Sequence, residues 1–239
     1  MAVHRGDPDP ATAPDILGLM RALDDMPARQ VVVEWNSLQV SLYVYARNYQ
    51  EITAFTGHLL NDESNEDIWH GQARRKMERV HHETARLLQN HTAAVEALLE
   101  HTDKIHQRLH TPQLKMQSYS ARKDQLRSDP LVSFVKCLRN VLLHGETAKL
   151  AFRTEFTAGD VSYSLGLGRS FLDKHSNWWK GPAKTYAVNV VDHVDIPQLL
   201  QDYHAKILGF MDWFVTEMMT VSKDDFPRSL MVNVNCSLR

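Results

Sequence analysis

Apolar residues recur at helical spacing through two long stretches in the first half of the chain. Over 35–60 they repeat every three or four residues, and 66–110 contains no proline and only one glycine, Gly71. Such spacing gathers apolar side chains on one face of a helix. We predict two long helices, linked through the capping residues of 61–65, as the antiparallel hairpin at the core of a bundle. A helix of 45 residues is unusually long, so a break near Asn90 stays an alternative.

Shorter helices are predicted around this hairpin. They are an amphipathic helix at 15–25, a weaker one from Pro112 to about Arg127, one at 130–144, and a last one from Asp195 to about Ser222. The helix at 130–144 has the clearest boundaries: Ser128 and Asp129 precede Pro130 at its first position, and Gly145 follows its end.

The hydrophobic pattern changes to a period of two after this helix. Alternating apolar residues at 150–156 and 161–167 flank a turn at 158–160, which predicts a β-hairpin, and Tyr186, Val188 and Val190 suggest a third strand. The expected fold is mainly α: a helical bundle with a small β-hairpin or three-strand insertion at about 148–191, between the last two helices.

Length and composition favour one globular domain. The chain has 239 residues, of which 43% are hydrophobic, enough for one sizeable core. The Pro-, Asp- and Ala-rich residues 1–14 are expected to be a disordered tail. The domain then covers 15–222, and 223–239 form a C-terminal tail.

Charge, cysteine usage and motifs exclude several classes of protein. The formal net charge is -2, so binding to nucleic acid requires a local basic surface. Cys137 and Cys236 form no spacing pattern, and no stretch is apolar enough to span a membrane. The first residues lack the apolar core of a signal peptide, so a cytoplasmic protein without membrane contact is expected. Phosphate-binding loops, dinucleotide fingerprints and esterase motifs are all missing.

The helix at 130–144 carries the most informative chemistry. Its apolar residues fall within about 120° of the helix circumference, and the opposite side collects Lys136, Arg139, Asn140 and His144, with Leu143 among them. Asn140 and His144 are four residues apart and share a face, whereas Arg139 must reach along the helix to meet His144. A guanidinium binds phosphate oxygens, and a histidine takes up or gives a proton near neutrality. These residue types suit cleavage of RNA by its own 2′-hydroxyl without a metal.

The run from Phe134 to Gly145, FVKCLRNVLLHG, resembles the signature of HEPN domains (higher eukaryotes and prokaryotes nucleotide-binding). That signature is an arginine, often followed by a polar residue, and a histidine four to six residues further on. Arg139, Asn140 and His144 match it, and long helices before the motif and a helix after it match the family's surroundings. The β insertion departs from the family's minimal bundle.

The resemblance implies a function. Many HEPN proteins are metal-independent ribonucleases of toxin–antitoxin, CRISPR-associated and phage-defence systems, and they dimerise so that two such helices form one composite site. It implies that Arg139 binds phosphate, that His144 carries acid–base work and that Asn140 orients one of them. RNA, a second copy of the chain and an antitoxin or defence-system protein are the partners it implies, with no cofactor.

Basic residues of the long helix are candidates for RNA contact. Arg75, Arg79, His82 and Arg86 share one face, and such a stripe can follow an RNA backbone, with Lys136 as a further phosphate contact. The alternative is a solvated face, favoured by Glu78 and Glu83 nearby.

Other candidate features have simpler structural explanations. His106 and His110 have the spacing of a metal pair, but no further ligand completes a set, so no metal is expected. His91 lies on the apolar face and is interpreted as a hydrogen-bonded core residue. Trp178 and Trp179 can stack on bases or cover a core.

Two functional hypotheses follow from these patterns. The first is a HEPN-like metal-independent endoribonuclease, active as a homodimer in a bacterial defence or toxin–antitoxin setting. The alternative is a non-catalytic helical dimer that binds a protein or nucleotide partner, with the same residues in its interface.

Overall fold

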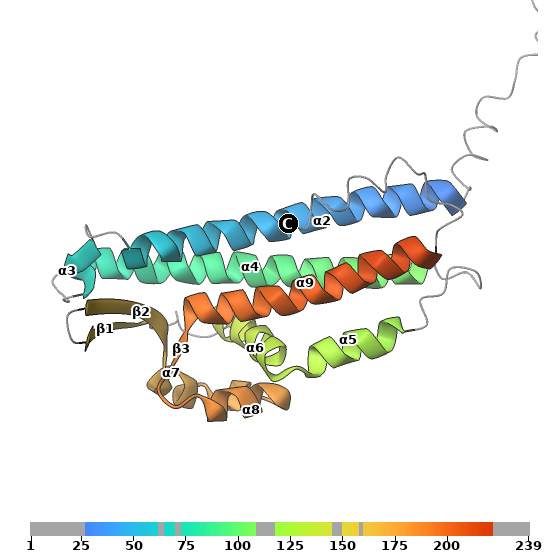
Figure 1. The fold of residues 1–239 in the computed structure, drawn as a ribbon. Helices are drawn as coiled ribbons and strands as arrows, with labels where there is room; N and C mark the ends of the chain where they lie inside the picture. Colours follow the sequence, from blue (N-terminus) through green and yellow to red (C-terminus); the bar gives the residue numbers. More distant parts are fainter. Residues whose placement is uncertain are drawn as a thin grey trace, which may run out of the picture.

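The computed structural model describes residues 27–61, 65–69, 73–108, 118–144, 150–157 and 160–221. The elements follow in the order α2 (Pro27–Asn61), α3 (Glu66–Trp69), α4 (Arg74–Arg108), α5 (Tyr119–Ser128), α6 (Pro130–His144), β1 (Leu150–Thr157), β2 (Asp160–Gly168), α7 (Arg169–Lys174), α8 (Pro182–Asn189), β3 (His193–Asp195) and α9 (Ile196–Val221). The fold is mainly α with a small antiparallel sheet, as the sequence predicts (Figure 1).

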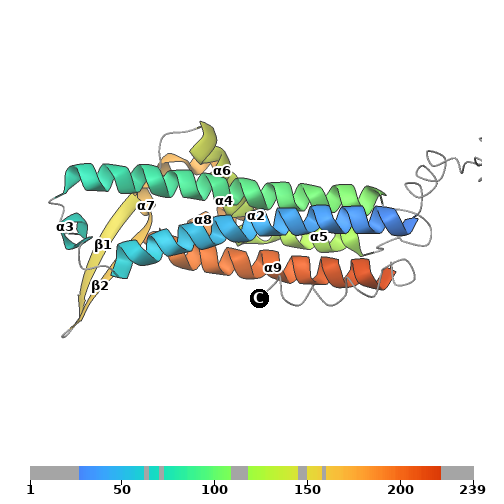
Figure 2. The same cartoon turned by 90° about the horizontal axis from the view of Figure 1, so that it is seen from above.

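Three long helices form the body of the molecule. Helices α2, α4 and α9 lie side by side in both views, with α2 antiparallel to the other two (Figures 1 and 2). Residues of α2 at helical spacings of three, four and seven are buried and form one seam: Val31, Trp35, Leu38, Leu42, Tyr45 and Ile52. Ion pairs Arg108–Glu34 (2.6 Å) and Arg86–Glu51 (2.8 Å) fix the antiparallel register of α2 and α4.

Helices α5 and α6 cover one side of this body. The Tyr119 hydroxyl of α5 is hydrogen-bonded to Thr102 (2.8 Å) and Asp103 (2.8 Å) of α4, and the buried Lys123 ammonium pairs with Asp103. Helix α6 then runs across the long helices rather than along them (Figures 1 and 2).

The sheet lies at one end of the bundle, beside α3 (Figure 2). Strands β1 and β2 pair antiparallel from Leu150↔Leu167 to Thr157↔Asp160, which confirms the predicted hairpin. Its inner face packs against Trp69 of α3, whose ring lies 4.9 Å from that of Tyr163 and 5.4 Å from that of Phe152, centroid to centroid.

The third strand was predicted at the wrong place. Residues 186–189 belong to α8, whereas β3 is His193–Asp195, paired to the end of β2. The alternation of Tyr186, Val188 and Val190 misled because Ala183 and Ala187, four residues apart, provide the buried face of a helix. The last strand of the sheet therefore follows the predicted insertion in sequence. Helices α7 and α8 come between β2 and β3 along the chain.

Several helix boundaries also differ from the prediction. Helix α2 begins at Pro27 rather than Trp35, and the segment predicted as one helix over 66–110 is divided into α3 and α4. Helix α4 continues through Asn90, so the alternative break there is wrong.

Some predicted features lie outside the described residues. They are the tails at 1–14 and 223–239, the helix at 15–25, the start at Pro112, and the residues His110 and Cys236.

The centre of the long helices holds a buried histidine. His91 is fully buried, and its ring centroid lies 5.5 Å from that of Tyr45, 5.7 Å from that of Tyr49 and 6.1 Å from that of Tyr203. Its core location is as predicted, but neither ring nitrogen has a hydrogen-bond partner, so the prediction of a hydrogen-bonded side chain is wrong. Burial, with a smaller contribution from His204, lowers the pKa of His91 to about 4, which keeps the ring neutral at pH 7.

Across the described part of the chain, every helix is too short or too polar to cross a membrane.

Candidate functional site

The start of α6 is held by several interactions. The Asp129 side chain accepts hydrogen bonds at Oδ1 from the backbone N–H of Leu131 (2.9 Å) and of Val132 (3.2 Å), which satisfies two free amides of the first turn. Its other oxygen, Oδ2, accepts a hydrogen bond from Lys206 of α9 (2.6 Å). The predicted cap is therefore confirmed, and it also ties α6 to α9.

The apolar face of α6 fixes which residues face outward. The predicted core stripe is buried in full: Leu131, Phe134, Val135, Leu138, Val141 and Leu142. On the side of α8, the Phe134 ring lies 5.0 Å from the ring of Trp179 and 4.7 Å from that of Tyr186. Helix α6 cannot rotate without exposing these rings, so its polar edge has one orientation.

The four polar residues predicted on α6 line this edge unequally. Lys136 and His144 are exposed, whereas Arg139 and Asn140 are half-buried. Asn140 and His144 lie one turn apart on the same face. Five residues at about 100° each place Arg139 about 140° around the helix from His144. A single chain therefore presents Arg139 and His144 on opposite flanks of α6.

The basic side chains on this edge have no acidic partner among the described residues. Among the described residues, no carboxylate forms an ion pair with Lys136, Arg139 or His144. The Nε atom of Arg139 is buried and has no hydrogen-bond partner. A buried N–H without an acceptor costs free energy, and an anion bound at this edge can supply that acceptor. His144 is the last residue of the helix.

The end of α6 contacts α4. Gln89 donates a hydrogen bond from Nε2 to the carbonyl oxygen of Leu142 (2.6 Å), one of the carbonyls that helix geometry leaves free at the end of α6. Gln89 follows Arg86 by three residues on α4, so the end of α6 lies close to the end of the predicted basic stripe.

The basic stripe itself is interrupted. Arg75 and Arg79 are exposed, and no ion pair involving them occurs among the described residues. Arg86 is bound by Glu83 (2.6 Å) and by Glu51 of α2 (2.8 Å), and its hydrogen bond lowers the pKa of the Glu83 carboxyl. Arg86 therefore supports the packing of α4 against α2, and Arg75 and Arg79 remain the better candidates for phosphate contact.

The predicted tryptophan pair is divided between core and surface. Trp179 is buried and donates from Nε1 to the carbonyl oxygen of Leu172 (2.8 Å), whereas Trp178 is partly exposed. Of the two interpretations, covering a core is therefore correct for Trp179.

Histidines outside α6 pack against aromatic rings. The His81 ring lies 5.2 Å from that of Phe152 and the His106 ring 4.2 Å from that of Tyr119, centroid to centroid. Burial lowers the pKa of His81. Within the ranges that the structure describes, no three His, Cys, Asp or Glu side chains gather as metal ligands would. Cys137 is a free, half-buried thiol that packs against the core.

A groove between α5 and α9 was not predicted. It has a volume of about 190 Å³, and Arg122, Lys206 and Trp213 are among the residues that line it. None of its lining residues belongs to α6. No sequence pattern signals this groove, because its two walls come from helices far apart in the chain.

No family model, no curated protein and no solved structure matches this chain.

Proposed function

We propose that this protein is a HEPN-like metal-independent endoribonuclease that acts through Arg139, Asn140 and His144. The observation that carries the proposal is the unpartnered Nε of Arg139, half-buried on a cationic edge that has no carboxylate partner among the described residues. A structural arginine is normally paired when buried. The Arg–Asn–His pattern on this edge, which resembles the HEPN signature, supplies the functional class.

The reaction needs two proton transfers at one phosphodiester. A base takes the proton of the 2′-hydroxyl, the P–O2′ bond forms, the P–O5′ bond breaks, and an acid protonates the departing O5′. Arg139 binds the phosphate oxygens and stabilises the charge that develops on them. The products carry a 2′,3′-cyclic phosphate at one end and a free 5′-hydroxyl at the other.

The separation of Arg139 and His144 around α6 favours a site built from two copies. A two-fold dimer brings the Arg139 flank of one α6 toward the His144 flank of the other, and it supplies two histidines for the two proton transfers. Asn140, one turn before His144, orients the imidazole. Arg75 and Arg79 extend the phosphate-binding surface along α4.

A test is to incubate the full chain with total RNA in excess chelator. Wild-type protein is expected to cleave it, and mass spectrometry should find cyclic phosphate ends. His144→Ala and Arg139→Met should each lower the rate at least 100-fold. His58→Ala is the matched control, because His58 is also an exposed histidine in the last turn of a helix.

Three results would overturn the proposal. They are cleavage that the chelator abolishes, cleavage that survives His144→Ala, and a monomer at micromolar concentration in light scattering. The third would exclude the composite site even if some nuclease activity remained.

The second candidate is a non-catalytic helical dimer that acts as a protein- or nucleotide-binding interaction module. An exposed apolar stripe on α2 favours it: Val33, Val40, Tyr43 and Val44 are 51%, 64%, 65% and 44% exposed. Exposed apolar groups at helical spacing are typical of protein interfaces. This candidate predicts dimers or partner binding that Val40→Asp disrupts, with no RNA cleavage.

A further inference from the structure

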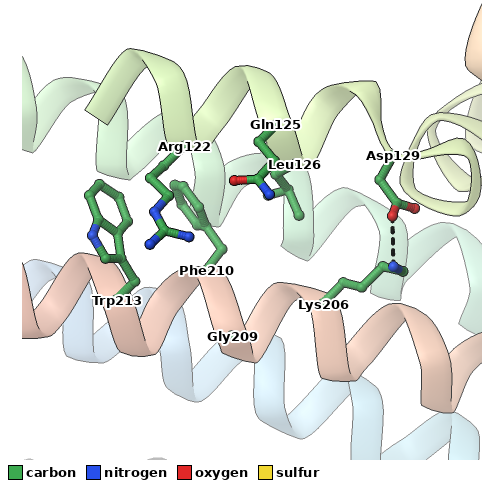
Figure 3. Close-up of a pocket in the computed structure, with 8 residues that line it drawn as sticks. All are labelled: Arg122, Gln125, Leu126, Asp129, Lys206, Gly209, Phe210 and Trp213. Carbon is green, nitrogen blue, oxygen red and sulfur yellow. Dashed lines mark hydrogen bonds and ion pairs between the residues drawn. The ribbon is translucent and has the colours of Figure 1, made fainter. Parts of the chain in front are cut away.

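The groove between α5 and α9 combines aromatic and charged side chains (Figure 3). Arg122, Gln125 and Leu126 come from α5, and Lys206, Gly209, Phe210 and Trp213 from α9, with Asp129 at one end. Its volume of about 190 Å³ is below that of most ligand pockets, which suits a small ligand.

One end of the groove offers an unpaired cation on an aromatic platform. The Arg122 guanidinium carbon lies 5.7 Å from the centroid of the Trp213 ring, and the Phe210 ring lies 5.7 Å from that of Trp213. Among the described residues, no carboxylate pairs with Arg122. A guanidinium held on an aromatic face keeps its N–H edge free, and that edge matches two phosphate oxygens.

The other end of the groove is polar and electrically balanced. Lys206 and Asp129 pair at 2.6 Å there, and the Gln125 amide lies between this pair and Arg122 (Figure 3). Arg122 and Asp129 are seven residues apart, so about 10 Å of helix separates the unpaired cation from the carboxylate. An anionic group is therefore favoured beside Arg122, and a neutral hydrogen-bonding edge beside Gln125 and Lys206.

Between the two ends, α9 lacks a side chain. Gly209 lies in the interior of α9, and a Cβ atom added there would meet no atom within 4 Å. Glycine destabilises a helix relative to alanine, and packing in the described structure does not require it here. Gly209 instead leaves the groove open between Phe210 and Lys206.

We propose that this groove binds one nucleoside monophosphate, either free or as a unit of a single RNA strand. The phosphate binds Arg122, the base lies over Gly209, and Gln125 and Lys206 contact the polar edge of the base. Phe210 is 6% exposed and adds only the small exposed part of its ring to the contact. The site is independent of the proposed cleavage, since it lies at the opposite end of α6 from His144, about 20 Å away along that helix.

Calorimetric titration of the full chain tests the proposal. We expect 5′-AMP to bind at least tenfold more tightly than adenosine or inorganic phosphate, because only AMP satisfies both ends of the groove. Gly209→Leu fills the open space and should weaken AMP binding at least tenfold without lowering the unfolding temperature. Arg122→Gln should reduce the affinity for AMP to that for adenosine.

Two controls separate this site from other effects. Arg127→Gln removes an exposed charge from the same helix, outside the groove, and should leave AMP binding unchanged. His144→Ala should also leave it unchanged, so the failure of the ribonuclease proposal and the failure of this one give different results.

Titration of hexaadenylate into the His144→Ala variant distinguishes a free nucleotide from a nucleotide unit of an RNA strand. Binding that Gly209→Leu abolishes assigns the groove to a strand, and AMP binding alone assigns it to a free nucleotide. The proposal is wrong if AMP binds no better than inorganic phosphate, or if Gly209→Leu and Arg122→Gln both bind AMP as the wild type does.

Discussion

Two histidines of this protein occupy opposite environments. His91 lies in the middle of α2, α4 and α9, fully buried among tyrosines, with no partner for either nitrogen. His144 lies at the exposed end of α6. The first is neutral at pH 7 and contributes packing, and its protonation in acid destabilises the fold. The second is exposed, so it can contact a bound substrate without disturbing the core.

The same contrast separates the two ends of α6. Its first turn is capped by Asp129, which is bound in turn by Lys206, so the polar groups there are satisfied. Toward the other end, Arg139 has a buried Nε without an acceptor. The cap of the first turn is therefore paired on both sides, whereas the Nε of Arg139 is not. The following predictions test this distinction between residues that hold the fold and residues that are free to act.

The largest expected loss of stability is at the buried face of α6. Leu138→Ala should lower the free energy of unfolding by about 2–5 kcal/mol, because Leu138 is buried and the core cannot fully close around the cavity. Urea unfolding measures it. Leu143→Ala is the matched control on the same helix, since Leu143 is 47% exposed and should lose far less. Equal losses at both positions would contradict the assignment of the two faces.

Acid should destabilise the protein through His91. The pKa of His91 is lowered from 6.5 to about 4, so the unfolded chain binds the proton more tightly than the folded one. The stability that this provides is complete above pH 6.5 and is lost as pH falls through 4, a change of about 3 kcal/mol. Burial lowers the pKa of His204 as well, and this adds in the same direction.

His91→Phe separates this contribution from the rest of the molecule. The variant keeps a ring among the tyrosines but cannot be protonated, so its unfolding free energy should vary less between pH 6.5 and 4. His144→Ala should leave the wild-type pH profile in place. An unchanged slope in His91→Phe would mean that other groups control the acid transition.

Much of the fold could be predicted from the sequence because local signals and burial agree. The periodic apolar residues of α2, α4 and α9 made these helices visible, and Asp129 and Asp195 mark helix starts that the structure confirms. The prediction failed where tertiary packing decides between two structures that the sequence permits. Residues 186–190 alternate like a strand, yet Ala183 and Ala187 pack as a helix against α6.

The candidate site could be predicted only in part. The candidate residues of α6 could be predicted from the sequence, because they are close together in the chain and their helix has clear boundaries. The pairing of Arg86 with Glu51, the missing partners of His91 and the groove beside Trp213 all depend on contacts between distant helices. No spacing rule within one segment contains that information.

A smaller loss is expected at the cap of α6. Asp129→Ala should lower the free energy of unfolding by about 1 kcal/mol, because two backbone N–H groups of the first turn lose their acceptor. Asp124→Ala removes an exposed carboxylate of α5 and serves as the control. Thermal unfolding of both variants measures the difference. Asp129→Asn should recover most of the lost stability, because the amide oxygen of asparagine also accepts hydrogen bonds from the N–H groups of the first turn. No recovery in Asp129→Asn would assign the loss to the contact with Lys206.

The smallest effects on stability are expected at the proposed catalytic residues. His144→Ala removes an exposed side chain and should change the free energy of unfolding by less than about 0.5 kcal/mol. Arg139→Met keeps the aliphatic part of the side chain and removes an N–H that has no acceptor, so it should leave stability unchanged or raise it slightly. In the proposed site, a bound phosphate supplies the missing acceptor. If Arg139→Met unfolds the protein as Leu138→Ala does, Arg139 is part of the framework, and the distinction between the two kinds of residue on α6 is lost.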